Sequence, residues 1–125
     1  MKAFYADHFV LPLPAGHRFP MEKYSRFRDL VSAQADIELV EAPSATDTQI
    51  LYAHDPSYLI KVIAGTLSAQ EQKEIGFPWS SKMVERSRRS AGATVAAAKT
   101  ALHEGIAANL AGGTHHAYRD TGSGF

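Results

Sequence analysis

The feature that most constrains the fold is a short apolar stretch, residues 106–110, which ends at Gly112 and Gly113 and leads into two adjacent histidines. An apolar run of this length between glycines is typical of a strand that is buried on both faces in an α/β sheet. Glycine at position 113 permits a sharp turn, so we expect His115 and His116 at the carboxyl end of that strand. Open α/β sheets place their functional sites at these ends.

The histidine pair allows two interpretations. In extended backbone, adjacent side chains point to opposite sides, so the pair chelates one metal less readily than a helical i, i+4 pair. A neutral imidazole accepts a proton near neutral pH and an imidazolium returns it, which makes His115 and His116 candidates for proton transfer. From the dipeptide alone, the non-functional interpretation, a loop with two solvated histidines, is favoured over a catalytic one.

The rest of the sequence alternates predicted helices with sparse strands, the pattern of an α/β fold. Asp55 and Pro56 mark a helix start, because the carboxylate can cap the helix and proline suits its first position. Ser68 and Glu71 form a capping box. The predicted elements are a strand from Phe4 that ends in the loop of Pro12 and Pro14, a helix over about 21–34, a strand over 37–40, a short helix capped by Ser44 and reaching His54, a helix from Pro56, a short helix from Ser68 to Gly76, and a long helix over about 81–103.

The long helix carries an apolar stripe, a run of small residues and a cluster of arginines. The small residues at 91–98 would let the helix lie close against the sheet. We interpret Arg86, Arg88 and Arg89 as a solvated face that pairs with Glu85 and its neighbours. The side chains expected to be buried are Met83, Val84, Ala91, Val95, Ala98 and Leu102.

Several other residues have a structural interpretation beside a functional one. His54 and Asp55 resemble a metal-binding or catalytic pair, but the carboxylate is better explained as a helix cap. His103 lies in a predicted last helical turn, where a partly charged imidazole favours the negative end of the helix dipole. Trp79 could belong to the core or line a pocket, and both remain open. We count it among the candidate substrate-binding residues.

Composition excludes several classes of protein. The chain has 13 basic and 13 acidic residues, and this balance gives no indication of nucleic-acid binding. Cysteine is absent, which excludes disulfides and thiolate metal sites and favours a reducing compartment. The start lacks the apolar core of a signal peptide, and no apolar run is long enough to span a bilayer. We therefore expect one domain, residues 1–125, in the cytoplasm and without membrane contact.

The loop after the apolar stretch has the order and spacing of a known motif. This loop resembles the active-site loop of the histone deacetylase superfamily, and the segments 16–24, 53–58, 77–80 and 84–92 resemble the N-terminal part of its bacterial, class IV-like members. The resemblance implies the N-terminal portion of an arginase/deacetylase-like three-layer fold with a mostly parallel sheet. The matching residues are Gly112-Gly113-Thr114-His115-His116-Ala117, then Asp120, then Gly124-Phe125.

The resemblance also implies an activity and a set of site residues. The family hydrolyses an N-acetyl amide on lysine or a polyamine-like amine with the help of a divalent metal, usually zinc. By position, His116 would act as general base and acid, and His115 would tune the site electrostatically. The remaining implied residues are Gly124 and Phe125 in the substrate tunnel and Arg18 at the channel proposed for acetate release.

The metal site implied by the resemblance lacks its ligands in this sequence. Family members hold the metal with an Asp-x-His pair and a later Asp, and no Asp-x-His occurs here. We therefore expect an N-terminal fragment of a zinc-dependent deacetylase that binds no metal and is inactive alone, the acetylated amine being the substrate of the whole enzyme. The alternative is a non-enzymatic module that self-associates, as a homodimer or larger oligomer, through its truncated sheet.

Overall fold

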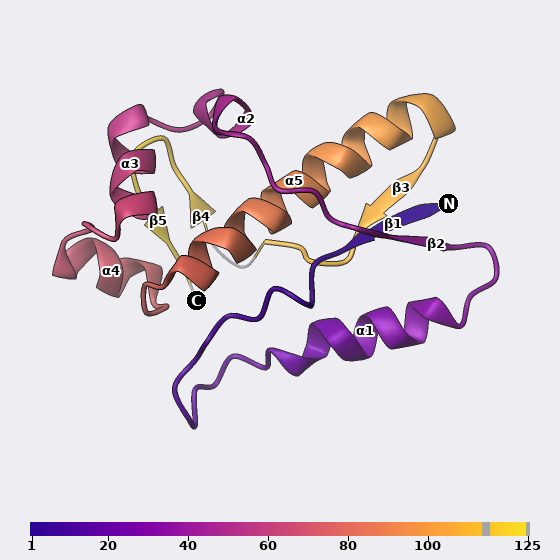
Figure 1. Cartoon of the computed structure of the whole chain (residues 1–125), viewed down its shortest axis with the longest axis horizontal. Helices are drawn as coiled ribbons and strands as arrows, with labels where there is room; N and C mark the ends of the chain where they lie inside the picture. The colour runs from indigo at the N-terminus through magenta and orange to yellow at the C-terminus, as the bar shows by residue number, and fades with distance from the viewer. Residues whose placement is uncertain (114–115, 125) are drawn as a thin grey trace.

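A parallel three-stranded sheet in the order β2-β1-β3 forms the centre of the computed structural model (Figure 1). The structure describes residues 1–113 and 116–124. Because the strands are parallel, their carboxyl ends meet at one edge of the sheet, and the predicted α/β fold with a parallel sheet is confirmed. The strands are β1 (Lys2–Tyr5), β2 (Glu38–Glu41) and β3 (Ala107–Asn109).

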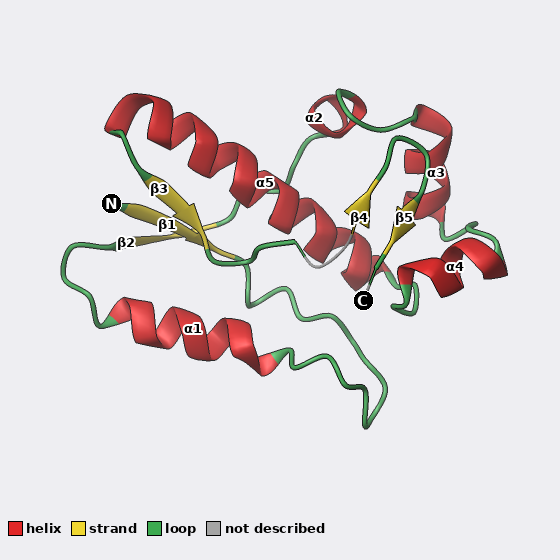
Figure 2. Ribbon diagram, turned by 180° about the vertical axis from the view of Figure 1, so that it is seen from behind, coloured by secondary structure: helices red, strands yellow, loops and turns green. Residues whose placement is uncertain are grey.

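Helices cover the sheet from opposite sides. Helix α1 (Glu22–Ser32) lies below the strands and α5 (Ser81–Glu104) above them in both views (Figures 1 and 2). Lys2 of β1 stands opposite Glu38 of β2 and opposite Ala107 of β3, which fixes the register of both pairs. The result is the helix, sheet, helix layering that the sequence resemblance implied.

Three short helices connect β2 to α5, and their ends follow local sequence signals. The predicted caps of the second and third are confirmed, because Asp55 accepts from the Ser57 N–H and Ser68 forms a capping box with Glu71. Both helices end at a left-handed glycine, as the C-terminal preference for glycine predicts. The three helices are α2 (Asp47–Leu51), α3 (Pro56–Ala64) and α4 (Ala69–Ile75).

Two predicted boundaries were wrong. Thr46, not Ser44, caps α2, because the Gln49 side chain three residues later completes a capping box with it. The first strand ends at Tyr5 instead of continuing toward the proline loop. The Ala6 carbonyl accepts from the Phe9 N–H and from an arginine of α5 instead of from a strand neighbour.

Helix α5 ends at Gly105 as predicted, but its buried face differs from the predicted stripe. Met83 is buried, Val84 and Val95 are half-buried, and the exposed predictions are Ala91, Ala98 and Leu102, the last 85% exposed. The helix instead turns its narrowest face inward, with Gly92, Ala93 and Ala97 buried. A Cβ atom on Gly92 would stand 1.9 Å from the Pro43 carbonyl oxygen, so only glycine permits this close approach to the chain after β2.

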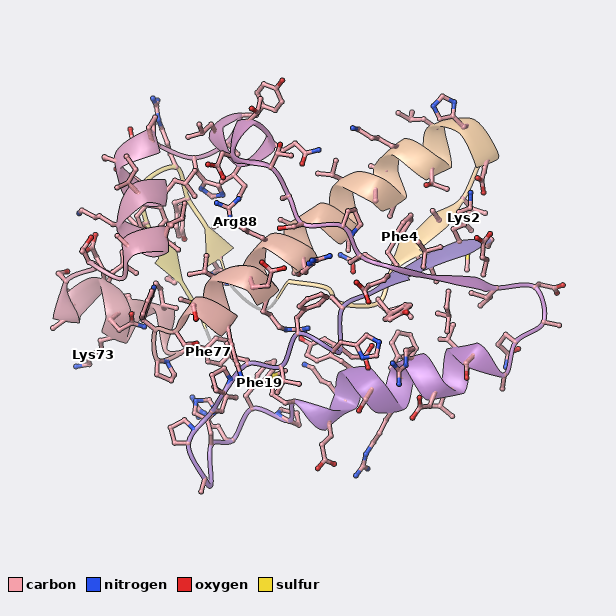
Figure 3. All side chains as sticks on the ribbon, in the orientation of Figure 1. Lys2, Phe4, Phe19, Lys73, Phe77 and Arg88 are labelled. Carbon is pink, nitrogen blue, oxygen red and sulfur yellow. The ribbon has the colours of Figure 1, made fainter. Side chains whose placement is uncertain are left out.

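The core consists of two clusters. The cluster between α5 and the sheet is built on Phe4 and on small side chains, namely Ala6, Ala42, Ala93, Ala97 and Ala111. The second cluster is larger in side-chain volume and contains Leu11, Phe19, Tyr24, Ile75, Phe77 and Met83. Its Phe19 and Phe77 rings meet edge to face with centroids 5.2 Å apart (Figure 3), which joins the loop before α1 to the chain before α5.

Strand β3 is less buried than predicted. All three of its residues are half-buried, and the preceding Ile106 is 61% exposed. The physical reason is that, within the described residues, β3 pairs only with β1 and its other edge has no neighbouring strand.

Among the described residues, no helix is both long enough and apolar enough to cross a membrane.

Candidate active site

A cavity of about 520 Å³ lies where α3, α5 and the chain after β3 meet. Gly112, Gly113 and His116 line it from the chain after β3, so His116 reaches the same cavity as the turn that follows that strand. The volume falls in the range of small-molecule sites, which combine apolar walls with a few polar groups. The apolar walls include Leu11, Met21, Leu59, Val62, Val84 and Val95.

The chain leaving β3 is held by side chains of α5. Asn109 Nδ2 donates to the Ser90 carbonyl at 3.2 Å and to Thr94 Oγ1 at 2.9 Å, while its Oδ1 accepts from the Ala111 N–H at 2.8 Å. Ser90 Oγ donates to the Ala111 carbonyl at 2.7 Å. The turn into Gly112 and the histidines is therefore tied to the long helix.

The histidine run continues into a small antiparallel hairpin, β4 (His116–Ala117) and β5 (Gly122–Ser123), in which His116 stands opposite Ser123. Gly122 lies directly against Tyr58 of α3, because a Cβ atom on it would be 2.9 Å from the hydroxyl oxygen. Burial raises the pKa of that hydroxyl above its ordinary value. The Gly124 N–H donates to the Glu74 carbonyl at 3.2 Å.

The turn between α2 and α3 anchors the tip of the hairpin. The Asp55 N–H donates to the Arg119 carbonyl at 2.7 Å, and His54 Nδ1, facing the Tyr118 carbonyl oxygen at 2.8 Å, acts as a donor. Hydrogen bonds from the Ser57 hydroxyl and N–H hold the pKa of the Asp55 carboxyl below its usual range. The interpretation of Asp55 as a helix cap is confirmed.

The prediction of a solvated arginine face was wrong, first of all for Arg86. This residue is buried, 8% exposed, and its Nη1 donates to the Ala6 carbonyl at 2.8 Å. Its guanidinium carbon lies 4.4 Å from the centroid of the Tyr24 ring. The sequence shows the spacing of arginines along a helix, but it does not show which loop folds over them. A solvated and a buried guanidinium therefore have the same sequence pattern.

The other two arginines also hold loops at the carboxyl ends of the strands. Arg88 donates to the Ala45 carbonyl at 3.1 Å and pairs with Asp47 at 2.6 Å, pointing from α5 toward α2 (Figure 3). Arg89 donates to the Ala42 carbonyl at 2.8 Å and pairs with Glu85 at 2.7 Å, so the predicted partner is confirmed. Together with Arg86, they fix the chain after β1 and after β2.

Two further candidates lie outside the cavity wall. Trp79 is 39% exposed, and its indole Nε1 donates to the Val62 carbonyl at 2.8 Å while the ring lies against Gly65. Arg18 is exposed in the loop before α1. Neither is among the described residues that line the cavity, and their roles in substrate binding and in the acetate channel stay predictions.

Three predicted site residues belong to the last part of the chain. His115 and Phe125 lie outside the described residues, so their proposed roles stay predictions. Gly124 has a φ of 120°, a conformation that favours glycine, and is half-buried beside α4. Sequence reasoning did not single out Asn109 or Ser90, and the available signal was a polar amide at the end of an apolar strand.

The described residues offer few donors for a metal ion at any one place. Within residues 1–113 and 116–124, no three or more histidine, cysteine, aspartate or glutamate side chains gather so that they could hold a metal ion. A catalytic zinc usually takes three protein ligands. The described residues therefore do not fit the metal that the resemblance implies.

The parallel sheet and its helical layers are those of an arginase/deacetylase-like α/β fold, which the solved structures below share. The histone deacetylase domain family matches residues 17–125, and the chain belongs to this family. In sequence it is similar to an uncharacterized protein of Picosynechococcus sp., with 40% identity over 124 residues, and to histone deacetylase 2 of Arabidopsis thaliana, with 29% identity over 118 residues.

Solved structures give the same fold. The chain is similar to a crystal structure of an HDAC homolog from Aquifex aeolicus, with a TM-score of 0.76, 25% identity and coverage of 99% of this chain and 37% of that one. It also resembles an HDAC homolog complexed with SAHA, with a TM-score of 0.70, 24% identity and coverage of 95% and 35%. Of the two sequence relatives, the match covers 97% and 87% of this chain but 41% and 30% of the relatives' own length.

Proposed function

We propose that these residues form part of the active site of a metal-dependent deacetylase that hydrolyses N-acetyl amides on lysine or polyamine-like amines. The observation that carries the proposal is the position of His116. It follows the Gly112 and Gly113 turn at the carboxyl end of β3 and lines the cavity, in a chain of the histone deacetylase family. The cytoplasmic location inferred from the sequence stays a prediction.

His116 has the chemistry for proton transfer in such a reaction. As a neutral imidazole it can take a proton from the attacking water, and as an imidazolium it can give one to the leaving amine. The apolar walls of the cavity suit the methylene stem of an acylated lysine or polyamine. The described residues offer no site for the zinc of the family, so the roles proposed for them are proton transfer and substrate binding.

The test compares the 125-residue chain with a family-length protein that carries the same residues. We expect the shorter chain to bind no zinc with micromolar affinity in calorimetry and to hydrolyse no acetyl-lysine peptide. A catalytic zinc usually needs three protein ligands, and no three potential ligands gather among the described residues. The longer protein should hydrolyse an acetyl-lysine peptide or an N-acetylpolyamine. Stoichiometric zinc on the 125-residue chain, or a longer protein inactive on both substrates, would overturn the respective part of the proposal.

The alternative function is self-association through the sheet, and the edge of β3 favours it. This strand, Ala107–Asn109, carries no charged residue or proline of the kind that protects natural sheet edges, and among the described residues its second edge is unpaired. Leu102 and Ile106 are exposed on the chain that leads into it. We propose a second copy of this chain as the occupant, since identical edges pair around a twofold axis.

We expect the 125-residue chain to form dimers in light scattering across a concentration series. Ile106→Lys should shift the chain to monomer, because it adds a charge beside the edge of β3 at a residue that is already exposed. The matched control is Ile60→Lys on α3, where the wild-type side chain is 65% exposed, and this variant should remain a dimer. A wild-type chain that stays monomeric at high concentration would rule out the alternative.

A further inference from the structure

We propose that Asn109 is the positioning residue of this site, and that its side-chain amide sets the path of the chain from β3 into the histidine loop. The expected effect of Asn109 on catalysis rests on the proposed function. The expected effect on the path of the chain does not, because it depends only on hydrogen bonds among Asn109, Ser90 and Ala111. Asn109 does not line the cavity itself, and it acts through the backbone that follows it.

Ala111 is held by side chains on both of its polar backbone groups. Its N–H donates to Asn109 Oδ1 at 2.8 Å, and its carbonyl accepts from Ser90 Oγ at 2.7 Å. The residue is 1% exposed, so neither group has water as an alternative partner. Loss of either side chain would leave a buried backbone group unsatisfied, which is costly.

An amide is required at position 109 because it must donate and accept at once. Nδ2 donates to the Ser90 carbonyl and to Thr94 Oγ1, while Oδ1 accepts from Ala111. A carboxylate of the same shape has only acceptors, so aspartate would turn an oxygen toward the Ser90 carbonyl oxygen. The Asn109→Asp change therefore tests the hydrogen-bond pattern at almost constant volume.

Gly112 and Gly113, the two described residues that follow Ala111 directly, have no comparable packing restraint. A Cβ atom added at Gly112 or at Gly113 would meet nothing within 4 Å, so packing does not define the backbone there. The next described contacts of the chain are the pairing of His116 and Ala117 with β5 and the contact of the Tyr118 carbonyl with His54. The direction in which the loop departs is thus set on its strand side at Ala111, and from there it leads to His116 at the cavity.

The experiment uses the 125-residue chain and NMR. Hydrogen exchange is followed at the Ala111 amide, and the imidazole signals of His116 are followed through a pH titration. In Asn109→Asp, the carboxylate and the Ser90 carbonyl oxygen repel each other, so the side chain should turn away from Ser90 and release the Ala111 N–H. Exchange at Ala111 should then accelerate by about tenfold or more, the effect of losing one buried hydrogen bond, and the His116 signals should move. The Ala42 amide, which donates to the Tyr5 carbonyl at 2.8 Å on the far side of the sheet, should keep its protection.

The control is Thr94→Val, which removes one acceptor of Nδ2 but leaves the bonds to Ser90 and Ala111. It should leave the His116 titration unchanged. Ser90→Ala is the second variant, and it should move the His116 signals even if Asn109→Asp does not fold. Folded Asn109→Asp or folded Ser90→Ala with wild-type His116 signals would overturn the inference.

Activity separates this inference from the proposed function. In an active family-length protein, Asn109→Asp should lower kcat by at least about tenfold with a smaller change in KM, because the apolar walls from α3 and α5 do not depend on the loop. An inactive wild-type protein would remove the proposed function, while the exchange data would still decide the role of Asn109. An active protein whose kcat is unaffected by Asn109→Asp would remove that role.

Discussion

Replacing His116 with alanine is expected to lower the turnover of a family-length deacetylase that carries these residues by about a hundredfold or more. The imidazole lines the cavity at the start of β4, and an imidazole can both accept and return a proton near neutral pH. His54 also lines the cavity, but its Nδ1 faces the Tyr118 carbonyl oxygen. The substrate-binding walls do not change, so the loss should be in kcat and only weakly in KM.

Folding should survive this substitution. The His116 side chain is exposed, and the strand it begins has two residues, so the replacement removes little packing. Circular dichroism melts of the variant and of the wild type check this directly. His103→Ala is the matched control, because His103 is an exposed histidine in the last turn of α5, remote from the cavity wall. A His116→Ala enzyme with near-wild-type turnover would remove this residue from the mechanism.

The elements of the fold were predictable where the signal is local. The Asp55 and Ser68 caps act on N–H groups two or three residues away, and the stops at Gly76 and Gly105 depend on the glycine itself. The order of strands and helices up to β3 also followed from the sequence, because short apolar runs and helical periodicity differ in period. The hairpin of β4 and β5 was not predicted.

The buried face of α5 depends on contacts between distant segments and could not be predicted in the same way. The helix has apolar residues on more than one side, and which side is covered depends on the chain after β2. The contact of Gly92 with the Pro43 carbonyl decides it, and Leu102 is left exposed as a consequence. The same limit applies to Asn109, whose partners Ser90 and Thr94 lie on another element.

Arg86 shows the largest effect of such distant contacts, and its replacement by alanine is expected to destabilise the chain by about 2–4 kcal/mol. A hydrogen bond from a charged donor contributes roughly 1.5–3 kcal/mol, and the Ala6 carbonyl would lose its 2.8 Å bond to the guanidinium and keep only the Phe9 N–H. Removing the side chain also leaves a void beside Tyr24, whose ring the guanidinium covers. For a small domain with a total stability of about 5–15 kcal/mol, this is a large fraction.

Urea unfolding measures the change as a lower midpoint at a similar m-value. Arg26→Ala is the control, because Arg26 pairs with Glu22 on the exposed face of α1 and has a side chain 77% exposed. A pair of that kind contributes roughly 0.5 kcal/mol or less. Arg86→Lys should fall between alanine and wild type, since an ammonium keeps a donor for Ala6 but loses the planar contact with Tyr24. Equal midpoints for Arg86→Ala and Arg26→Ala would mean that the loop after β1 is held without the guanidinium, and that the chain's first strand end is positioned by packing alone.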